Sequence, residues 1–207
     1  MSDSIEILLV RHGEIDPRMK KICYGAMDID LSDQGRLDSQ RVAQQILTSV
    51  APQAIFHSGL SRTRYMADQI ARLGPDPLPV IDDMRLRERN YGRWQGLSWD
   101  DAYASDPENF DGLIERPDSY RPPGGETTTE MQDRMVDWLD DLVTRSSGDQ
   151  PGPIIAVSHS GPIAAMAGKL LNLPPTQWGP WMVAPLATIH LVGRRHLSTV
   201  SWEVRKR

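Results

Sequence analysis

The segments 5-IEILLVRHGE-14 and 154-IIAVSHSG-161 decide which fold this sequence predicts. Each begins with an apolar run typical of a buried β-strand and continues into a polar residue, a histidine and a nearby glycine. In open α/β sheets, ligands bind at the carboxyl ends of the strands, near the point where the strand order switches. We therefore expect His12 and His159 to face each other across a ligand site.

Between and beyond these segments, apolar runs alternate with stretches of helical periodicity. We expect helices to begin at Ser32 and Leu60, and a third helix to begin at a capping box formed by Thr127 and Glu130. This third helix has a clear apolar stripe, made by Met131, Met135, Trp138, Leu139 and Leu142. Such alternation is typical of a largely parallel sheet covered on both faces.

The predicted fold is a single α/β domain over residues 1–207, with a mostly parallel central sheet and helices on both faces. Its chain is interrupted at about residues 87–125 by a loop-rich lid insertion that holds several aromatic residues. The further strands are expected over residues 53–58 and 78–81, followed by a closing antiparallel pair over 185–192 and 198–204 around Gly193.

The composition excludes several classes of protein. Lys and Arg number 23 and Asp and Glu 28, so the net charge of −5 lacks the basic character of a nucleic-acid binder. Cys23 is the only cysteine, so neither an intramolecular disulfide nor a paired-cysteine metal site is expected. The N-terminal apolar run is short, contains Glu6 and lacks a basic leader, which excludes a signal peptide or membrane span there. We expect a soluble, cytoplasmic protein without nucleic-acid or membrane partners.

The residues beside the two histidines suit an anion. Gly13 and Gly161 are expected to let the backbone approach a ligand closely. The helix that begins near Gly161 directs free N–H groups and its positive end toward an anion. A single histidine at a strand end is often satisfied by backbone groups and has no chemical role. The argument therefore depends on the joint occurrence of the two histidine segments.

That joint pattern resembles the histidine phosphatase superfamily, also called the phosphoglycerate mutase-like family. The resemblance covers nearly the whole chain and lies in six ordered blocks: RHGE at 11–14, YGAMDIDLSDQG at 24–35, SGLSRT at 58–63, LRERNYGRWQG at 86–96, PPGGET at 122–127 and VSHSG at 157–161. The short insertion with PPGGET looks more like the compact phosphatase branch, including the α-ribazole phosphatases, than like the longer cofactor-dependent mutases.

The resemblance implies a role for each matching residue. His12 is implied as the nucleophile, attacking phosphorus through one ring nitrogen while a backbone group holds the other. Arg11 and Arg62 are implied to clamp the phosphoryl oxygens, with His159 as a further donor. Glu88 is implied as the general acid for the leaving oxygen and then as the base that activates water. Neither a metal ion nor another cofactor is implied.

The resemblance thus implies a metal-independent phosphomonoester hydrolase that acts on a small phosphorylated metabolite through a phosphohistidine. Phosphoglycerate mutase-type transfer is the alternative activity, and a non-catalytic phosphate-binding module is the alternative without catalysis. Such a module has no use for an acid, so Glu88 argues against it. A serine hydrolase centred on Ser160 is rejected because Ser158 and Pro162 stand where its turn needs glycines.

The loop after the first block departs from the family pattern. Arg18 stands where many members have asparagine, and Lys20 and Lys21 follow it. This loop either binds a second acidic group of the substrate or is a solvated charged surface. Tyr24 and Gly25, which open the second block, are the other candidates for substrate contact.

Overall fold

The described part of the molecule is built on one mixed sheet. The computed structural model describes residues 4–75, 77–145, 152–197 and 199–206, and within them six strands lie in the order β3-β2-β4-β1-β5-β6. The strands are β1 (Ser4–Arg11), β2 (Ala54–His57), β3 (Val80–Asp82), β4 (Ile154–Ser158), β5 (Thr188–His196) and β6 (Thr199–Lys206). Strands β1 to β4 are parallel and β5 is antiparallel to its neighbours, so the expected mostly parallel sheet is confirmed.

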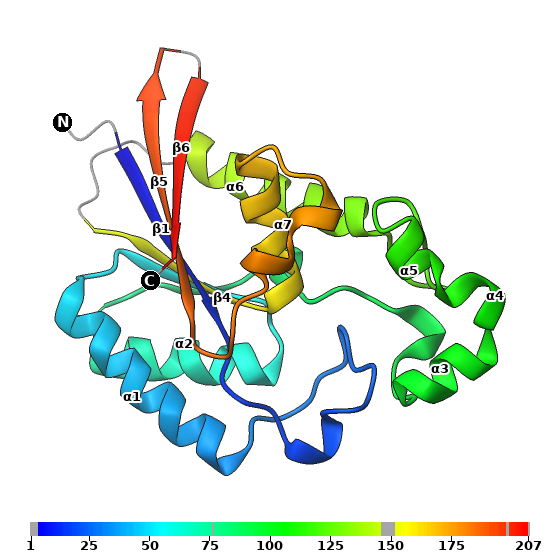
Figure 1. Cartoon of the computed structure of the whole chain (residues 1–207). Helices are drawn as coiled ribbons and strands as arrows, with labels where there is room; N and C mark the ends of the chain where they lie inside the picture. Colours follow the sequence, from blue (N-terminus) through cyan, green and yellow to red (C-terminus); the bar gives the residue numbers. More distant parts are fainter. Residues whose placement is uncertain (1–3, 76, 146–151, 198, 207) are drawn as a thin grey trace.

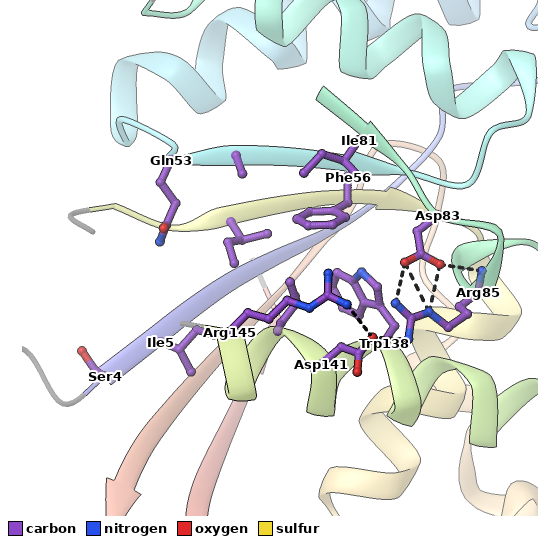
Figure 2. A pocket seen from close by; sticks show the side chains of 13 residues that line it. Ser4, Ile5, Gln53, Phe56, Ile81, Asp83, Arg85, Trp138, Asp141 and Arg145 are labelled. Carbon is purple, nitrogen blue, oxygen red and sulfur yellow. Dashed lines mark hydrogen bonds and ion pairs between the residues drawn. The ribbon is translucent and has the colours of Figure 1, made fainter. Parts of the chain in front are cut away.

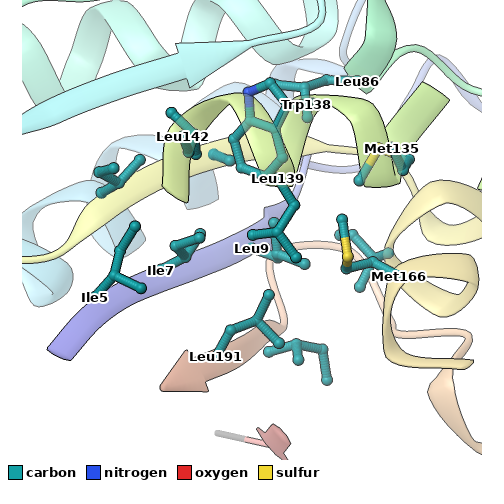
Figure 3. Packing of buried hydrophobic residues seen from close by; sticks show 14 of the residues in the cluster. Ile5, Ile7, Leu9, Leu86, Met135, Trp138, Leu139, Leu142, Met166 and Leu191 are labelled. Carbon is teal, nitrogen blue, oxygen red and sulfur yellow. The ribbon is translucent and has the colours of Figure 1, made fainter. Parts of the chain in front are cut away.

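Helices cover both faces of this sheet, as predicted (Figure 1). The longer helices are α1 (Asp33–Ser49), α2 (Ser61–Leu73), α6 (Thr128–Arg145) and α7 (Ser160–Leu170). Side chains of β1 point alternately to the two faces. Leu8 and Val10 pack in the cluster under α1 and α2, whereas Ile7 and Leu9 pack under α6 and α7 (Figure 3). Burying an apolar side chain of this size contributes about 1.5–3 kcal/mol.

The helix-start signals in the sequence act as predicted. The Ser32 hydroxyl accepts a hydrogen bond from the backbone N–H of Gly35 at 2.9 Å and so caps α1. At the start of α6, the Glu130 N–H donates to Thr127 Oγ1 and the Thr127 N–H donates to the Glu130 carboxylate, at 3.0 and 2.8 Å. This reciprocal pair is the expected capping box. Among the described helices, none is both long and apolar enough to cross a membrane.

The insertion is more regular than the expected loop-rich segment. It contains the short helices α3 (Trp99–Ser105), α4 (Pro107–Phe110) and α5 (Gly112–Glu115), which lie beyond the carboxyl ends of the parallel strands (Figure 1). Its own small core includes Trp94, Ala102 and Tyr120 together with Cys23 from the loop after β1. The sequence of the insertion shows no helical periodicity because each of these helices has only four to seven residues, which is about one to two turns.

The closing antiparallel pair is present, but Gly193 is not its turn. Gly193 lies inside β5 opposite Trp202 of β6, and the strands continue to His196 and Thr199. A Cβ atom on Gly193 would come within 2.8 Å of both the Trp202 ring and the Ile5 side chain. The glycine therefore makes room for an indole ring rather than reversing the chain. Residue 198, where the second strand was expected to begin, lies outside the described residues.

The register of β1 and β4 fixes the geometry of the ligand site. Arg11 pairs with Ser158 at the last position of the two neighbouring strands. The His12 N–H then donates to Ser158 O at 3.1 Å, one residue beyond that pair. The connection from β1 leads through α1 to β2, on the far side of β4. The two histidines therefore follow adjacent strands at a switch in strand order, where α/β sheets bind their ligands.

Candidate active site

The rings of His12 and His159 meet at the carboxyl ends of β1 and β4. Their centroids are 5.0 Å apart and the ring planes are inclined by 62°. The residues are only 2% and 0% exposed, so both rings lie in a desolvated environment. A dry site of this kind strengthens every electrostatic interaction with a charged group that enters it.

One nitrogen of His12 is held by the backbone. Its Nδ1 lies 2.7 Å from the carbonyl oxygen of Gly13, and because a carbonyl only accepts, Nδ1 carries the proton. Burial, followed by the positive charge of Arg62, lowers the pKa of His12 from 6.5 to about 3. The ring is therefore neutral near pH 7, and Nε2 has the lone pair that a nucleophile requires.

A chain of hydroxyl groups sets the tautomer of His159. Thr63 Oγ1 donates to Leu60 O at 2.8 Å, so Ser58 donates to Thr63 at 2.8 Å and accepts from His159 Nε2 at 2.9 Å. The other ring nitrogen, Nδ1, then accepts from Nε of Arg62 at 3.3 Å. Burial and the Arg62 charge keep the pKa of His159 well below its ordinary value, which matches this neutral ring.

Two arginines supply positive charge to the site. Arg62, in the first turn of α2, is fully buried and donates to the backbone oxygens of Met27 and Gly25 at 2.6 and 2.8 Å. Arg11 donates from Nη1 to Val183 O at 2.7 Å, while its buried Nε has no hydrogen-bond partner among the described residues. An unpaired buried donor costs stability, so this Nε–H is a ready partner for an oxyanion.

Glu88 projects toward the first turn of α7. Its carboxylate accepts from the N–H of Arg89 at 2.9 Å and from the N–H of Gly161 at 3.4 Å. A Cβ atom on Gly161 would lie 2.4 Å from Glu88 Oε1. Gly161 thus makes room for the Glu88 side chain, a packing role that the sequence did not predict, and the start of α7 faces that carboxylate.

Gly13 has a packing role that the sequence did not predict either. A Cβ atom there would meet Ser39 Oγ at 2.5 Å and Gly35 O at 2.7 Å, both in α1. Gly13 therefore allows the chain to pass close to the first turns of α1, and the approach of its backbone to a ligand stays a prediction. The sequence could not distinguish these uses, because both require the absence of a side chain.

A cavity of about 230 Å³ opens over Glu88 and Gly161. Of the candidates for substrate contact, Tyr24 and Gly25 lie in its wall, but Arg18 does not line it. The Arg18 side chain is 87% exposed and forms an ion pair with Asp16. The other side chains in the wall include Lys20, Ile22, Tyr91, Trp99 and Met182. No sequence pattern identified Met182, which reaches the site from the segment between α7 and β5.

A larger cavity, of about 380 Å³, lies at the opposite ends of the strands. It is enclosed by the first residues of β1, β2 and β4 and by α6, near Trp138 and Phe56 (Figure 2). None of the predicted site residues lines it, and the amino ends of parallel strands are not where α/β sheets bind ligands. Its size therefore does not make it the active site. Within the described residues, no three His, Cys, Asp or Glu side chains are grouped to hold a metal ion.

The sheet order, the two neighbouring histidine rings and the two arginines beside them are the features of a phosphoglycerate mutase-like fold, and the positive charge of this site suits an anion. A family model for the histidine phosphatase superfamily, branch 1, matches residues 7–203, and the chain belongs to this superfamily. The resemblance of the six sequence blocks is thereby confirmed.

Two curated relatives are phosphatases. The chain is 33% identical over 178 residues to glucosyl-3-phosphoglycerate phosphatase from Mycolicibacterium vanbaalenii, covering 83% of this chain and 76% of the relative. It is 30% identical over 181 residues to metal-independent phosphoserine phosphatase from Arabidopsis thaliana, covering 83% of this chain and 74% of the relative. The enzyme class predicted from the sequence, a histidine-type phosphatase, is confirmed.

Solved structures show the same fold. A mycobacterial glucosyl-3-phosphoglycerate phosphatase in complex with inorganic phosphate superposes with a TM-score of 0.80 at 28% identity, over 97% of this chain and 95% of the other. The α-ribazole phosphatase of Shigella flexneri gives a TM-score of 0.81 at 20% identity, over 98% of this chain and 96% of the other. At that identity the second likeness concerns the fold alone.

Proposed function

We propose that this chain hydrolyses a small phosphorylated metabolite through a phosphohistidine on His12, without a metal ion. The observation that carries the proposal is the state of His12, whose Nδ1 proton is held by Gly13 O, leaving the Nε2 lone pair available beside Arg62. In the first step, Nε2 attacks phosphorus, the bond from phosphorus to the ester oxygen breaks, and Glu88 gives its proton to the departing oxygen.

In the second step, Glu88 takes a proton from water as the water oxygen attacks the phosphohistidine. The phosphorus–nitrogen bond breaks, inorganic phosphate leaves, and His12 returns to its neutral form. Glu88 has regained the proton that it gave up in the first step. The cycle therefore consumes one ester and one water molecule and returns both side chains to their starting states.

The surrounding charges support this chemistry. A phosphoryl group in transfer spreads negative charge over its equatorial oxygens, so the enzyme contributes mainly positioning and positive charge. Arg11 brings a buried Nε–H that has no partner in the part of the chain that the structure describes, and Arg62 places a guanidinium beside both histidine rings. His159 adds a donor at Nδ1 once that nitrogen is protonated.

The cavity supports a small substrate. Its volume of about 230 Å³ is below the range of about 300–1,000 Å³ that is usual for ligand pockets. The relatives are named as phosphatases of phosphoserine and glucosyl-3-phosphoglycerate, which are small phosphate esters. We infer that the substrate of this chain is of the same general class.

Phosphate release from a panel of small phosphomonoesters, measured in the presence of a chelator, tests the proposal. The wild type should release phosphate from at least one of them, and His12→Ala should release none. His190→Gln is the matched control, because His190 is also buried but pairs with Glu6 on the sheet. Full activity of His12→Ala, or loss of wild-type activity in chelator, contradicts the mechanism.

The same experiment separates the alternatives. A mutase passes the phosphoryl group to a second sugar-acid, so labelled phosphate would appear in that acceptor and not in solution. A binding module would bind phosphate with wild-type Arg11 and Arg62 but would release none from any ester. Labelled phosphate on wild-type His12 after quenching in alkaline detergent, in which the phosphorus–nitrogen bond survives, excludes a binding module. Transfer of that label to water and not to an added sugar-acid then distinguishes a hydrolase from a mutase.

A further inference from the structure

The backbone around Glu88 has no regular structure of its own. Glu88 lies between two single 3₁₀ turns, Met84–Leu86 and Gly92–Trp94, in a segment that bends around the site. Several backbone groups in this segment find their hydrogen-bond partners in the side chains of distant residues. The position of the Glu88 carboxylate therefore depends on what holds these groups.

The guanidinium of Arg134 holds the segment on both sides of Glu88. Its Nη1 donates to the carbonyl oxygen of Arg85 at 2.5 Å, and its Nη2 donates to that of Glu88 at 3.2 Å. Because the guanidinium is planar and rigid, these two bonds fix the distance between the two carbonyl groups.

Glu126 completes this arrangement from the other side. Its carboxylate accepts from Nε and Nη2 of Arg134 at 3.0 and 2.7 Å, which is a bidentate ion pair. The same carboxylate accepts from the N–H of Asn90 at 2.8 Å, and the N–H of Glu126 donates to Asn90 O at 2.9 Å. The two side chains are only 20% and 18% exposed, so solvent screens the pair weakly.

Arg134 connects this pair to the core. It lies on α6 beside Met135, which is fully buried in the cluster that α6 forms with the sheet. From the sheet, Ser158 Oγ donates to Leu86 O at 2.7 Å, directly before His159. The Glu88 segment is thus held both by α6 and by β4, the strand that leads to His159.

We infer that the Arg134–Glu126 ion pair is a positioning device for the general acid, acting through the backbone of residues 85–90. This inference rests on the proposed function, in which Glu88 protonates the leaving oxygen. Within the described residues, neither side chain of the pair is hydrogen-bonded to His12 or His159. The effect of the pair is to keep the Glu88 carboxylate within proton-transfer reach of the ester oxygen.

Glu126→Gln is the sharpest variant for a test. Among the described residues, the hydrogen bonds of the Glu126 carboxylate are all accepted from N–H donors, those of Arg134 and Asn90. In either orientation, the glutamine amide NH₂ therefore faces a donor, although its shape matches glutamate. Arg134→Lys is the second variant, because it keeps the positive charge and the helix but cannot bridge the two carbonyl groups. If Glu126→Gln does not fold, the measurements on Arg134→Lys test the inference in its place.

The readout is the rate of phosphoenzyme formation from two esters, p-nitrophenyl phosphate and glycerol phosphate. The aryl leaving group departs without a proton, whereas the alkoxide needs one. We expect Glu126→Gln and Arg134→Lys to raise the aryl-to-alkyl rate ratio by about tenfold or more, since general acids contribute about 10²–10⁴-fold. Equal losses for both esters would indicate a general structural role and would overturn the inference.

Asp141→Asn is the matched control. Asp141 lies on the same helix and accepts from the Arg85 side chain at 2.8 Å, in a half-exposed ion pair beside the larger cavity (Figure 2). It contacts the same segment but none of the backbone groups around Glu88. We expect its rate ratio to equal that of the wild type, and a tenfold rise in this variant would also contradict the inference.

A double variant separates this inference from the proposed function. If the ion pair acts through Glu88, adding Glu126→Gln to Glu88→Gln leaves the rate ratio unchanged. A further rise in the ratio would mean that Glu126 acts by another route. If Glu88→Gln alone leaves the ratio at the wild-type value, the assigned role of Glu88 fails first, and the inference fails with it.

Discussion

Nε of Arg62 donates to Nδ1 of His159 at 3.3 Å, so this histidine accepts a hydrogen bond from an arginine. The direction follows from the hydroxyl chain through Ser58 and Thr63, which requires the proton of His159 on Nε2. To donate to a phosphoryl oxygen, Nδ1 must first gain a proton. A dianion that neutralises the Arg62 charge makes that gain favourable, since the charge of Arg62 helps to keep the pKa of His159 low.

The first prediction is that dianion binding takes up a proton at His159. Sulfate is the suitable probe, because it stays a dianion across the neutral range. Burial and the positive charge of Arg62 hold the pKa of His159 well below its ordinary value. We expect bound sulfate to raise that pKa. Calorimetric titrations should therefore show the sulfate dissociation constant rising toward about tenfold per pH unit as the pH increases through neutrality.

His159→Asn is the control for this measurement, since asparagine cannot take up a proton. The variant should bind sulfate more weakly but with an affinity that is nearly independent of pH. If the pH dependence survives in His159→Asn, the proton goes to another group, and the assignment to His159 is wrong. The measurement needs no turnover, so a loss of activity in the variant does not affect it.

The second prediction concerns acid stability and His12. Its pKa is about 3 in the folded protein, below the 6.5 of an unperturbed histidine. The unfolded state thus binds the proton more readily, and the stability contributed by the neutral ring, complete above pH 6.5, is lost as the pH falls toward 3. At pH 5 the loss is about 2 kcal/mol, taking 1.36 kcal/mol per pH unit.

Urea unfolding of wild type and His12→Gln at pH 7 and pH 5 checks this value. The wild type should lose about 2 kcal/mol more than the variant between the two conditions. His159 contributes in the same direction in both proteins and cancels in the comparison. Equal losses in the two proteins would show that His12 titrates in the folded state as it does in the unfolded chain.

The third prediction concerns the charged loop after β1. Lys20 lies in the cavity wall and pairs with Glu14 at 2.8 Å, whereas Arg18 pairs with Asp16 outside it. We expect Lys20→Met to raise KM about two- to fivefold for phosphate esters that have a second anionic group, because exposed charge pairs contribute about 0.2–1 kcal/mol. Esters without that group should be unaffected.

Arg18→Met removes the same charge from the same loop and is the matched comparison. It should change KM less than Lys20→Met does, and both effects should shrink at high salt. A larger effect of Arg18→Met would favour the sequence-based expectation that Arg18 contacts the substrate. The measurement is KM at low and high ionic strength for a pair of esters that differ only in the second anionic group.

Much of this architecture could be predicted from sequence because its signals are local. The strand before His12 and the capping box of Thr127 and Glu130 depend on nearest neighbours, and the structure has both. Periodicity failed in the insertion, where the helices are too short to show it. The close contacts of Gly13 with α1 and of Gly161 with Glu88 could not be predicted, because a glycine leaves open which distant group approaches it.

The ion pair of Arg134 and Glu126 could not be predicted from the sequence either. Glu126 belongs to a recognisable block, but Arg134 is one polar residue among many on α6. Nothing in its neighbours indicates that it contacts carbonyl groups about fifty positions away, at residues 85 and 88. The role of such a residue can be recognised only when the path of the intervening chain is known, because that role depends on tertiary contacts alone.

The last prediction uses the close approach of Gly161 and Glu88. Alanine is favoured over glycine in a helix by about 1 kcal/mol, so Gly161→Ala should not destabilise α7. Its Cβ atom, however, would lie 2.4 Å from Glu88 Oε1, and the carboxylate must move away. We therefore expect a thermally stable variant whose rate on alkyl phosphates is lower by about tenfold or more, since displacing a general acid forfeits part of its 10²–10⁴-fold contribution.

Gly179→Ala is the control, because no described atom lies within 4 Å of the new Cβ. It should match the wild type in thermal stability and in rate. Thermal unfolding beside steady-state rates on an alkyl ester decides the point: a stable Gly161→Ala protein with undiminished rates would show that the position of the Glu88 carboxylate seen here does not matter for turnover.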